Sequence, residues 1–268
     1  MKVGATVAFP TLCSSFIEMR FGENKIASGS GFIVKYRGTY LVTARHNLTG
    51  RDQNTDICIS PNGGIPNKVV IECRTRMQIP GTKDTFAAPV RKINLDLYKD
   101  ESPQWLEHPI LGKTADIAVI PLNEIDDAIG FDIEDEVVIN YGDKSEKFKP
   151  KFEMMDSLVV CGYPFGQSSG NSFPIWCDAR LASEYYYNIE GKPIFFVDCR
   201  ARMGQSGSAV FHWSSEFRSD NPAMSWAMRP NKAAYVMGVY SGRINKESDI
   251  GIVWKISCVR DIIDATIS

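Results

Sequence analysis

The chain has 268 residues, of which 44% are hydrophobic, 11% aromatic and 23% charged, a composition typical of an ordinary soluble globular protein. Its 30 basic and 32 acidic residues leave a formal net charge of -2, so no overall field favours nucleic acid or an anionic membrane as a partner. No apolar run approaches the roughly 18 residues that span a bilayer.

The N-terminal segment and the cysteines both predict a cytoplasmic protein. Residues 1–10 contain a single lysine and no apolar run long enough for a secretory signal. The cysteines are seven, an odd number, and no two of them have the CxxC spacing, whereas a secreted disulfide scaffold normally shows an even and denser set. The prediction is therefore a set of buried free thiols, at Cys13, Cys58, Cys73, Cys161, Cys177, Cys199 and Cys258.

Apolar runs of strand length recur along the chain, separated by turn residues. They lie at 31–34, 40–43, 116–120, 158–161, 194–197, 209–211, 235–239 and 251–254. Short β-branched runs with turn signals between them predict an all-β sandwich or barrel. The one clear helical pattern is C-terminal, with Ser257 as its cap and apolar residues at helical spacing after it, namely Val259, Ile262, Ile263 and Ile267.

Two polar segments interrupt the strand pattern. Residues 123–156 are charged and weakly periodic, which indicates a connection between two lobes. Residues 214–232 stand between two strong strands and predict a surface loop. The expected organisation is a first lobe over 1–125, a linker over 126–156 and a second lobe over 157–268 that ends in a helix.

Segment 203–210 places a serine between glycines, in a tight turn just before a strand. Acyl transfer needs an exposed hydroxyl and two backbone N–H groups aimed at the developing oxyanion. Gly204 can adopt backbone angles that turn its N–H inward, so the N–H groups of Gly204 and Ser206 would form the oxyanion hole. Taken alone, Gly-x-Ser-Gly is also the sequence of a plain glycine-serine turn.

A histidine and an aspartate stand beside two other strands. His46 ends an apolar strand at a turn, which suits a general base, whereas His108 lies in a proline-flanked loop and His212 follows a strand without a comparable setting. Asp116 stands directly before a buried strand, where a carboxylate can orient an imidazole.

Taken singly, each of these residues is more often an ordinary surface, core or turn residue. The order His, Asp, Ser, each at the edge of a β-run, is one of the few known triad orders. The combination therefore predicts His46 as the base, Asp116 as its orienting group and Ser206 as the nucleophile.

Motifs along nearly the whole chain resemble the chymotrypsin-like, or trypsin-like, serine peptidases, and among these the bacterial HtrA/Deg-type and other bacterial trypsin-like peptidases. They comprise Ser-Gly-Ser-Gly-Phe-Ile-Val at 28–34, Thr-Ala-Arg-His at 43–46, Ala-Asp-Ile-Ala-Val-Ile at 115–120, Cys-Gly-Tyr-Pro-Phe-Gly at 161–166, the spacing from 198 to 206, and Gly-Val-Tyr-Ser-Gly at 238–242. No PDZ-like segment follows them, so a full HtrA protein is not expected.

The resemblance implies two six-stranded antiparallel Greek-key β-barrels with a C-terminal helix and an active site in the cleft between the barrels. His46 and Asp116 would come from the first lobe and Ser206 from the second. The implied activity is that of a serine endopeptidase, which hydrolyses a polypeptide substrate through an acyl-enzyme intermediate.

The resemblance also implies a set of substrate-binding residues. The strand of Tyr240, Ser241 and Gly242 would align the substrate. Arg200 would lie at the base of the pocket for the P1 side chain, where a buried guanidinium would favour an acidic residue, unless it points outward into solvent. Val253 would form a pocket wall and make the pocket shallow.

Three features depart from the family pattern. Gln205 stands where the trypsin subgroup has the aspartate that receives the new N-terminal ammonium of a cut zymogen, so we expect control by loop ordering instead. Arg45 replaces a small residue before His46 and either has no effect or lowers the imidazole pKa by like charge. The segment 51–110 is long and polar, and could cover the cleft or bind a partner.

The sequence leaves open functions other than that of an active peptidase. A catalytically silent peptidase fold that binds peptides or acts as a scaffold is the main alternative, although no triad member is missing. The peptidase itself is expected to have narrow specificity, or to stay latent until a protein or ligand orders its loops. Three dispersed histidines without paired cysteines offer no zinc site, and no phosphate-binding loop appears, so no cofactor is expected. The sequence carries no signal for an oligomeric state.

Overall fold

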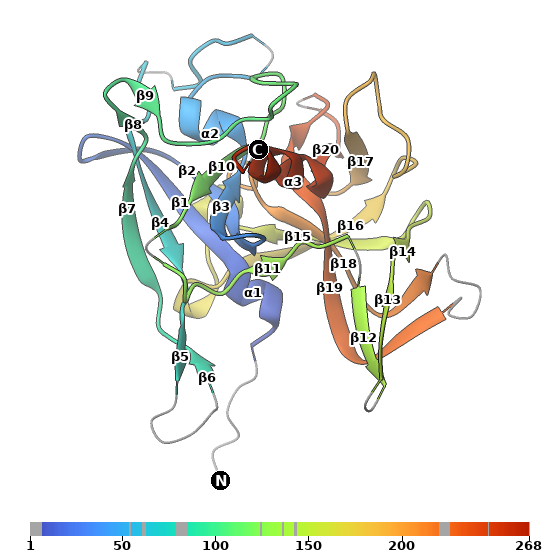
Figure 1. Ribbon diagram of the computed structural model, residues 1–268. Helices are drawn as coiled ribbons and strands as arrows, with labels where there is room; N and C mark the ends of the chain where they lie inside the picture. The colour runs from blue at the N-terminus through green and yellow to red at the C-terminus, as the bar shows by residue number, and fades with distance from the viewer. Residues whose placement is uncertain are drawn as a thin grey trace.

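A computed structural model describes residues 7–53, 55–60, 63–78, 85–123, 125–135, 137–141, 144–219, 226–245 and 247–267. Strands dominate and form two main sheets (Figure 1). The elements of the first part of the chain are α1 (Phe9–Cys13), β1 (Ser14–Phe21), β2 (Asn24–Lys35), β3 (Thr39–Thr43), α2 (Arg45–Thr49), β4 (Lys68–Cys73), β5 (Arg76–Gln78), β6 (Thr85–Ala87), β7 (Arg91–Asp96), β8 (Tyr98–Lys99), β9 (Ser102–Pro103), β10 (Ala118–Pro121) and β11 (Phe131–Asp132). Those of the second part are β12 (Val137–Tyr141), β13 (Lys144–Phe148), β14 (Pro150–Lys151), β15 (Ser157–Gly162), the 3₁₀ turns η1 (Pro164–Gly166) and η2 (Gly170–Ser172), β16 (Ile175–Leu181), β17 (Ile194–Asp198), β18 (Ala209–Ser219), β19 (Trp226–Arg243), β20 (Ile250–Lys255) and α3 (Ile256–Asp264).

The first sheet joins its strands in the order β10-β3-β2-β1-β4-β7, all antiparallel, and β11 pairs with β2 in parallel. Strand β2 is buried on both faces over 31–34, because successive side chains point to opposite sides of a sheet. Ile33 enters the core of the first lobe, whereas Phe32 and Val34 enter a second core shared with the other lobe.

The second sheet closes on itself. Its strands follow the order β18-β15-β16-β17-β20-β19, and β19 pairs with β18 to complete a six-stranded barrel, while β14 adds to the far end of β18. Leu158, Phe195 and Val210 fill the barrel interior and are fully buried.

The prediction of an all-β, chymotrypsin-like fold is confirmed, and the two sheets differ in closure. The first curls into a half-barrel, and within the described residues its edge strands β7 and β10 do not pair with each other. Leu106 occupies the edge of β10 instead, exchanging backbone hydrogen bonds of 2.8 and 3.1 Å with Val119.

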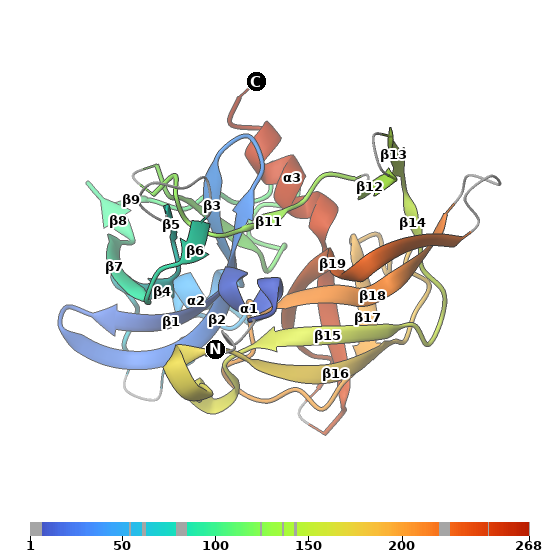
Figure 2. The ribbon, with the colours of Figure 1, turned by 90° about the horizontal axis from the view of Figure 1, so that it is seen from below.

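An aromatic cluster joins the two lobes. Phe131, which follows the first lobe, lies with its ring centroid 5.9 Å from that of Phe32 and 6.0 Å from that of Phe211 on β18. The C-terminal helix α3 leaves β20 and runs beside β3 and β11 of the first sheet (Figure 2). Tyr36 of the first lobe donates a 3.2 Å hydrogen bond to Asp264 at the end of α3.

The C-terminal helix is confirmed, with one difference in its start. Helix α3 begins at Ile256 and its cap is Lys255, so Ser257 lies inside the first turn and Ile267 lies beyond the helix end. No helix in the described part of the chain is long and apolar enough to cross a membrane.

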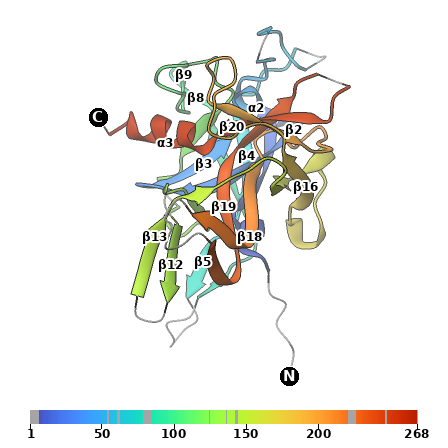
Figure 3. The ribbon, with the colours of Figure 1, turned by 90° about the vertical axis from the view of Figure 1, so that its right-hand side faces the viewer.

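The prediction of a surface loop over 214–232 is wrong. Strand β18 continues to Ser219 and β19 begins at Trp226. The two strands pair antiparallel, beginning with Arg218 opposite Trp226 and continuing toward the barrel. Together they extend beyond the barrel, near the β12–β13 hairpin (Figure 3). A polar run can form a hairpin because the paired backbones satisfy each other's hydrogen bonds whatever their side chains are.

Replacement of Phe131 by alanine tests how far the two lobes depend on this aromatic cluster. Because Phe131 is 2% exposed and touches rings of both lobes, we expect a loss of about 3–5 kcal/mol in the free energy of unfolding, as for other buried phenylalanines. The matched control is Phe21→Ala, because Phe21 is 56% exposed. Urea denaturation measures both, and equal losses would contradict the assignment.

Candidate active site

His46 lies just after β3, in the short helix α2. The strand brings the chain to the edge of the first lobe, and α2 ends at Gly50, whose φ of +64° is the left-handed conformation that glycine adopts readily. The Gly50 N–H donates a 2.9 Å hydrogen bond to the carbonyl of His46. The histidine is thereby held at a turn of defined geometry, with 18% of its side chain exposed.

Asp116 accepts three hydrogen bonds in an almost fully buried position. Its Oδ2 lies 2.7 Å from His46 Nδ1, and its Oδ1 accepts the His46 backbone N–H at 2.9 Å. Ser241 Oγ, at the end of β19 in the other lobe, donates to Oδ2 at 2.5 Å. Because Nδ1 donates to a carboxylate, Nε2 of the neutral imidazole carries the free lone pair and can accept a proton.

The two groups of this pair shift each other's pKa. Burial by itself lowers the pKa of His46, but the charge of Asp116 and the hydrogen bond to it outweigh burial and raise that pKa above the ordinary 6.5. Burial by itself raises the pKa of Asp116, but the charge of His46 and the hydrogen bonds from His46 and Ser241 bring it below the ordinary 3.8.

Ser206 lies in the turn before β18 and is held from both lobes. Its carbonyl accepts hydrogen bonds from the Ser30 N–H at 3.1 Å and from Asn47 Nδ2 at 2.9 Å, both in the first lobe. Its hydroxyl donates to the Ser241 carbonyl at 3.1 Å. Within the described residues, no hydrogen bond joins Ser206 Oγ to His46, and such contacts are often loose before substrate binds.

The backbone of the Ser206 turn leaves two donors available. Gly204 has a φ of +89°, and a Cβ there would fall 2.6 Å from the Tyr163 carbonyl oxygen, so only glycine fits. Its carbonyl accepts the Ser30 hydroxyl at 2.7 Å. The N–H groups of Gly204 and Ser206 donate to no acceptor in the part of the chain that the structure describes. Two N–H groups beside a serine hydroxyl are the arrangement that stabilises an oxyanion.

Gln205, between these two residues, is fully buried and neutral. Its side-chain oxygen accepts the Arg202 N–H at 2.6 Å, and its side-chain nitrogen donates to Cys177 Sγ at 3.1 Å. The Gln205 side chain is therefore held by hydrogen bonds to neutral groups.

A cavity of about 230 Å³ opens beside the histidine and the aspartate. His46, Asp116, Ser241 and Gly242 all line it, so it joins both lobes. The structure therefore brings these four predicted residues together around one cavity. The hydrogen bond from the Ser206 hydroxyl to the Ser241 carbonyl links the serine to this cavity as well.

The profile of the trypsin-like peptidase domain matches residues 29–217, well over half of the chain. The chain belongs to this family. No curated protein sequence matches it.

Solved structures resemble this trypsin-like domain over almost its whole length. A thermostable serine protease, AL20, from an extremophilic microorganism is 10% identical, with 97% of this chain and 100% of that one covered at a TM-score of 0.51. The protease Anisep from Arthrobacter nicotinovorans is 13% identical, with 96% of each chain covered at a TM-score of 0.50. At this identity the likeness shows the fold.

The trypsin-like domain does not bury Arg200, which was expected at the base of a pocket. Arg200 is exposed, because the neighbouring Cys199 and Ala201 turn into the barrel core and are 3% and 2% exposed. Val253 and Tyr240 lie in that same core, at 0% and 2% exposure. A buried guanidinium is therefore absent from this position.

Arg45 does not contribute a like charge to the imidazole. Its Nε lies 2.8 Å from Glu107 Oε1, and the same oxygen accepts Trp105 Nε1 at 3.0 Å. Of the two outcomes expected for Arg45, the structure favours the one without effect on His46.

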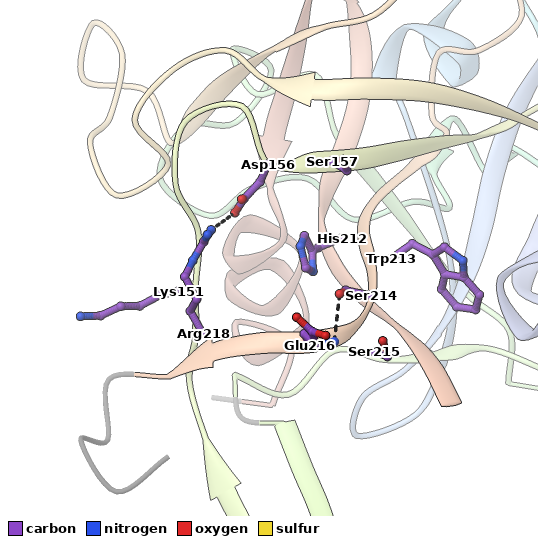
Figure 4. Close-up of a pocket in the computed structure, with 9 residues that line it drawn as sticks. All are labelled: Lys151, Asp156, Ser157, His212, Trp213, Ser214, Ser215, Glu216 and Arg218. Carbon is purple, nitrogen blue, oxygen red and sulfur yellow. Dashed lines mark hydrogen bonds and ion pairs between the residues drawn. The ribbon is translucent and has the colours of Figure 1, made fainter. Parts of the chain in front are cut away.

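The other histidines lie in different settings. His108 is 6% exposed, and its Nδ1 accepts the N–H groups of Ile110 and Leu111 at 3.2 Å each. His212 lines a separate pocket of about 400 Å³ in the second barrel, together with Asp156 and Ser157 (Figure 4).

Two polar side chains of that pocket, Ser157 and Asp156, are bound to arginines. Asp156 forms an ion pair with Arg218, and Arg180 donates to Ser157 Oγ at 2.6 Å. Burial lowers the pKa of His212. This histidine, serine and aspartate are therefore not arranged as His46, Ser206 and Asp116 are.

Sequence reasoning missed several residues that hold the site. Ser30 and Asn47 bind the Ser206 carbonyl, and the Ser241 hydroxyl binds Asp116, although Ser241 was expected only to align substrate. Ser30 and Asn47 lie within or beside the motifs at 28–34 and 43–46, but nothing in those motifs indicates a contact with a turn about 160 residues later in the chain.

A pH titration by NMR checks the coupling of His46 to Asp116. With only three histidines in the chain, each imidazole signal can be assigned with single His→Gln variants. We expect His46 to titrate above 6.5 in the native chain and lower in Asp116→Asn, because asparagine removes the charge that stabilises the imidazolium.

His212, whose lowered pKa has a different cause, is the internal control and should not move. An Asp116→Asn protein whose His46 keeps its native pKa would show that the aspartate does not set the titration.

Proposed function

We propose that the chain is a serine endopeptidase that hydrolyses polypeptides through His46, Asp116 and Ser206. The observation that carries the proposal is the hydrogen-bonded pair of His46 and buried Asp116, together with a serine turn whose two N–H groups donate to no acceptor among the described residues. Membership of the trypsin-like peptidase family supports it.

In the proposed reaction, Ser206 Oγ attacks the scissile carbonyl carbon and its proton passes to His46 Nε2. The carbonyl oxygen becomes an oxyanion that the N–H groups of Gly204 and Ser206 stabilise. The C–N bond then breaks as His46 protonates the leaving amine, which leaves an acyl-enzyme. Water, deprotonated by His46, releases the acid and restores the serine hydroxyl.

Asp116 serves this sequence by holding His46 in the tautomer with a free Nε2 and by stabilising the imidazolium. The Ser206 hydroxyl donates to Ser241, so it must rotate toward His46 before it attacks. We therefore propose that binding of a substrate, or of an activating protein or ligand, completes the arrangement. All seven cysteines are free, which supports a reducing, cytoplasmic setting.

A fluorophosphonate probe tests the proposal directly, because it labels only an activated serine. We expect the native chain to be labelled and Ser206→Ala to lose labelling altogether. The matched control is Ser208→Ala, which removes a buried hydroxyl two residues away and should keep the label. Mass spectrometry of the labelled peptide locates the modified residue.

Absence of labelling, with or without candidate activators, would favour the alternative of a catalytically silent, peptide-binding fold. Labelling of the isolated chain, together with cleavage of a broad peptide library, would show instead that no activator is needed.

A further inference from the structure

One buried side chain of the second barrel, that of Tyr240, belongs to the strand that binds the Ser206 turn. Tyr240 directly precedes Ser241, whose carbonyl accepts the Ser206 hydroxyl. Its backbone is tied to the nucleophile turn, because the Gly207 N–H donates to its carbonyl at 2.7 Å and its own N–H donates to the Ser208 carbonyl at 2.9 Å. The position of its ring relative to Ser206 is therefore set by the same hydrogen bonds that hold the turn.

The Tyr240 ring fills the gap between three segments. It is 2% exposed and belongs to a core cluster that contains Cys199 and Ala201 of the loop leading to Ser206 and Val253 of β20. On β20 it lies against Gly251, where a Cβ would fall 2.5 Å from the ring carbon Cε2. Gly251 therefore leaves room for this ring.

This step rests on the proposed function, which determines the orientation of a bound substrate. That orientation determines which substrate side chain the Tyr240 ring would exclude. His46, on the first-lobe side, must protonate the leaving amine, so the leaving half of the substrate lies toward the first lobe. The half that supplies the scissile carbonyl lies toward the end of β19. With the scissile carbonyl at Ser206 Oγ, the proposal requires the side chain of this residue, P1, to point toward the core cluster that contains the Tyr240 ring.

We propose that Tyr240 closes the P1 pocket and restricts cleavage to bonds that follow glycine, alanine or serine. A larger P1 side chain would have to displace a packed ring, and packed interiors admit extra atoms only at a cost. This specificity differs from the acidic preference expected from Arg200, whose exposed guanidinium does not lie in the core that contains Tyr240.

The Tyr240 hydroxyl allows the effect of the size of this side chain on P1 specificity to be separated from the effect of its polarity. Among the described residues it has no hydrogen-bond partner and is buried, so a P1 side chain cannot reach it while the ring stays in place. Removal of the hydroxyl alone, in Tyr240→Phe, keeps the ring and should keep the specificity.

The experiment compares peptidyl diphenyl phosphonates that carry alanine or phenylalanine at P1, each of which phosphonylates an activated serine. We expect the native chain to react at least about 100-fold faster with the alanine probe, since steric discrimination in pockets reaches this order. Tyr240→Val should reduce the ratio to about 1 or reverse it, and Tyr240→Phe should leave it unchanged. Phe195→Leu, in the same core, is the control for general loosening.

Several outcomes would overturn the proposal. These are a native chain that prefers the phenylalanine probe, a ratio that Tyr240→Val does not change, or a ratio lost in Tyr240→Phe. Because the ratio is taken on one sample, partial unfolding of a variant lowers both rates alike. If Tyr240→Val fails to fold, the proposal is tested by the ratio of the two probe rates in the native chain and in the smaller change Tyr240→Leu. Failure of the proposed function is distinct, because it would abolish labelling by the fluorophosphonate as well.

Discussion

The buried carboxylate of Asp116 is the group on which the geometry of the site depends. A buried charge is costly unless it is paired and hydrogen-bonded, and here two donors come from His46 and one from Ser241. His46 follows β3 of the first lobe, whereas Ser241 ends β19 of the second barrel. The carboxylate that binds the imidazole is therefore also bound from the second lobe, through the Ser241 hydroxyl.

The Ser206 turn is held by neutral groups from both lobes. Gln205 binds Arg202 and Cys177 inside the second lobe, and the Ser206 carbonyl binds Ser30 and Asn47 of the first. All four of these hydrogen bonds join neutral groups. Hydrogen bonds between the two lobes therefore support both the Ser206 turn and the carboxylate that binds the imidazole.

The strand pattern could be predicted from local sequence, because apolar runs and turn residues report on neighbours in the chain. The candidates His46, Asp116 and Ser206 were each ambiguous alone, and only their order along the chain and the family resemblance predicted a triad. Residues 214–232 were predicted wrongly because their strand character depends on pairing between β18 and β19 and not on apolar periodicity. Arg200 was placed by its distance from Ser206 along the chain, and that distance does not reveal which neighbours turn inward.

The sequence by itself determined the all-β class, the C-terminal helix and the membership of a peptidase family, since these follow from patterns that are local or repeated along the chain. Only the tertiary structure decided that the second sheet closes and the first remains a half-barrel, that Ser241 binds Asp116, and that Tyr240 is buried whereas Arg200 is exposed. These features depend on contacts between strands far apart in the chain. Packing against those distant strands determines which side chain is buried, and no single segment contains that information.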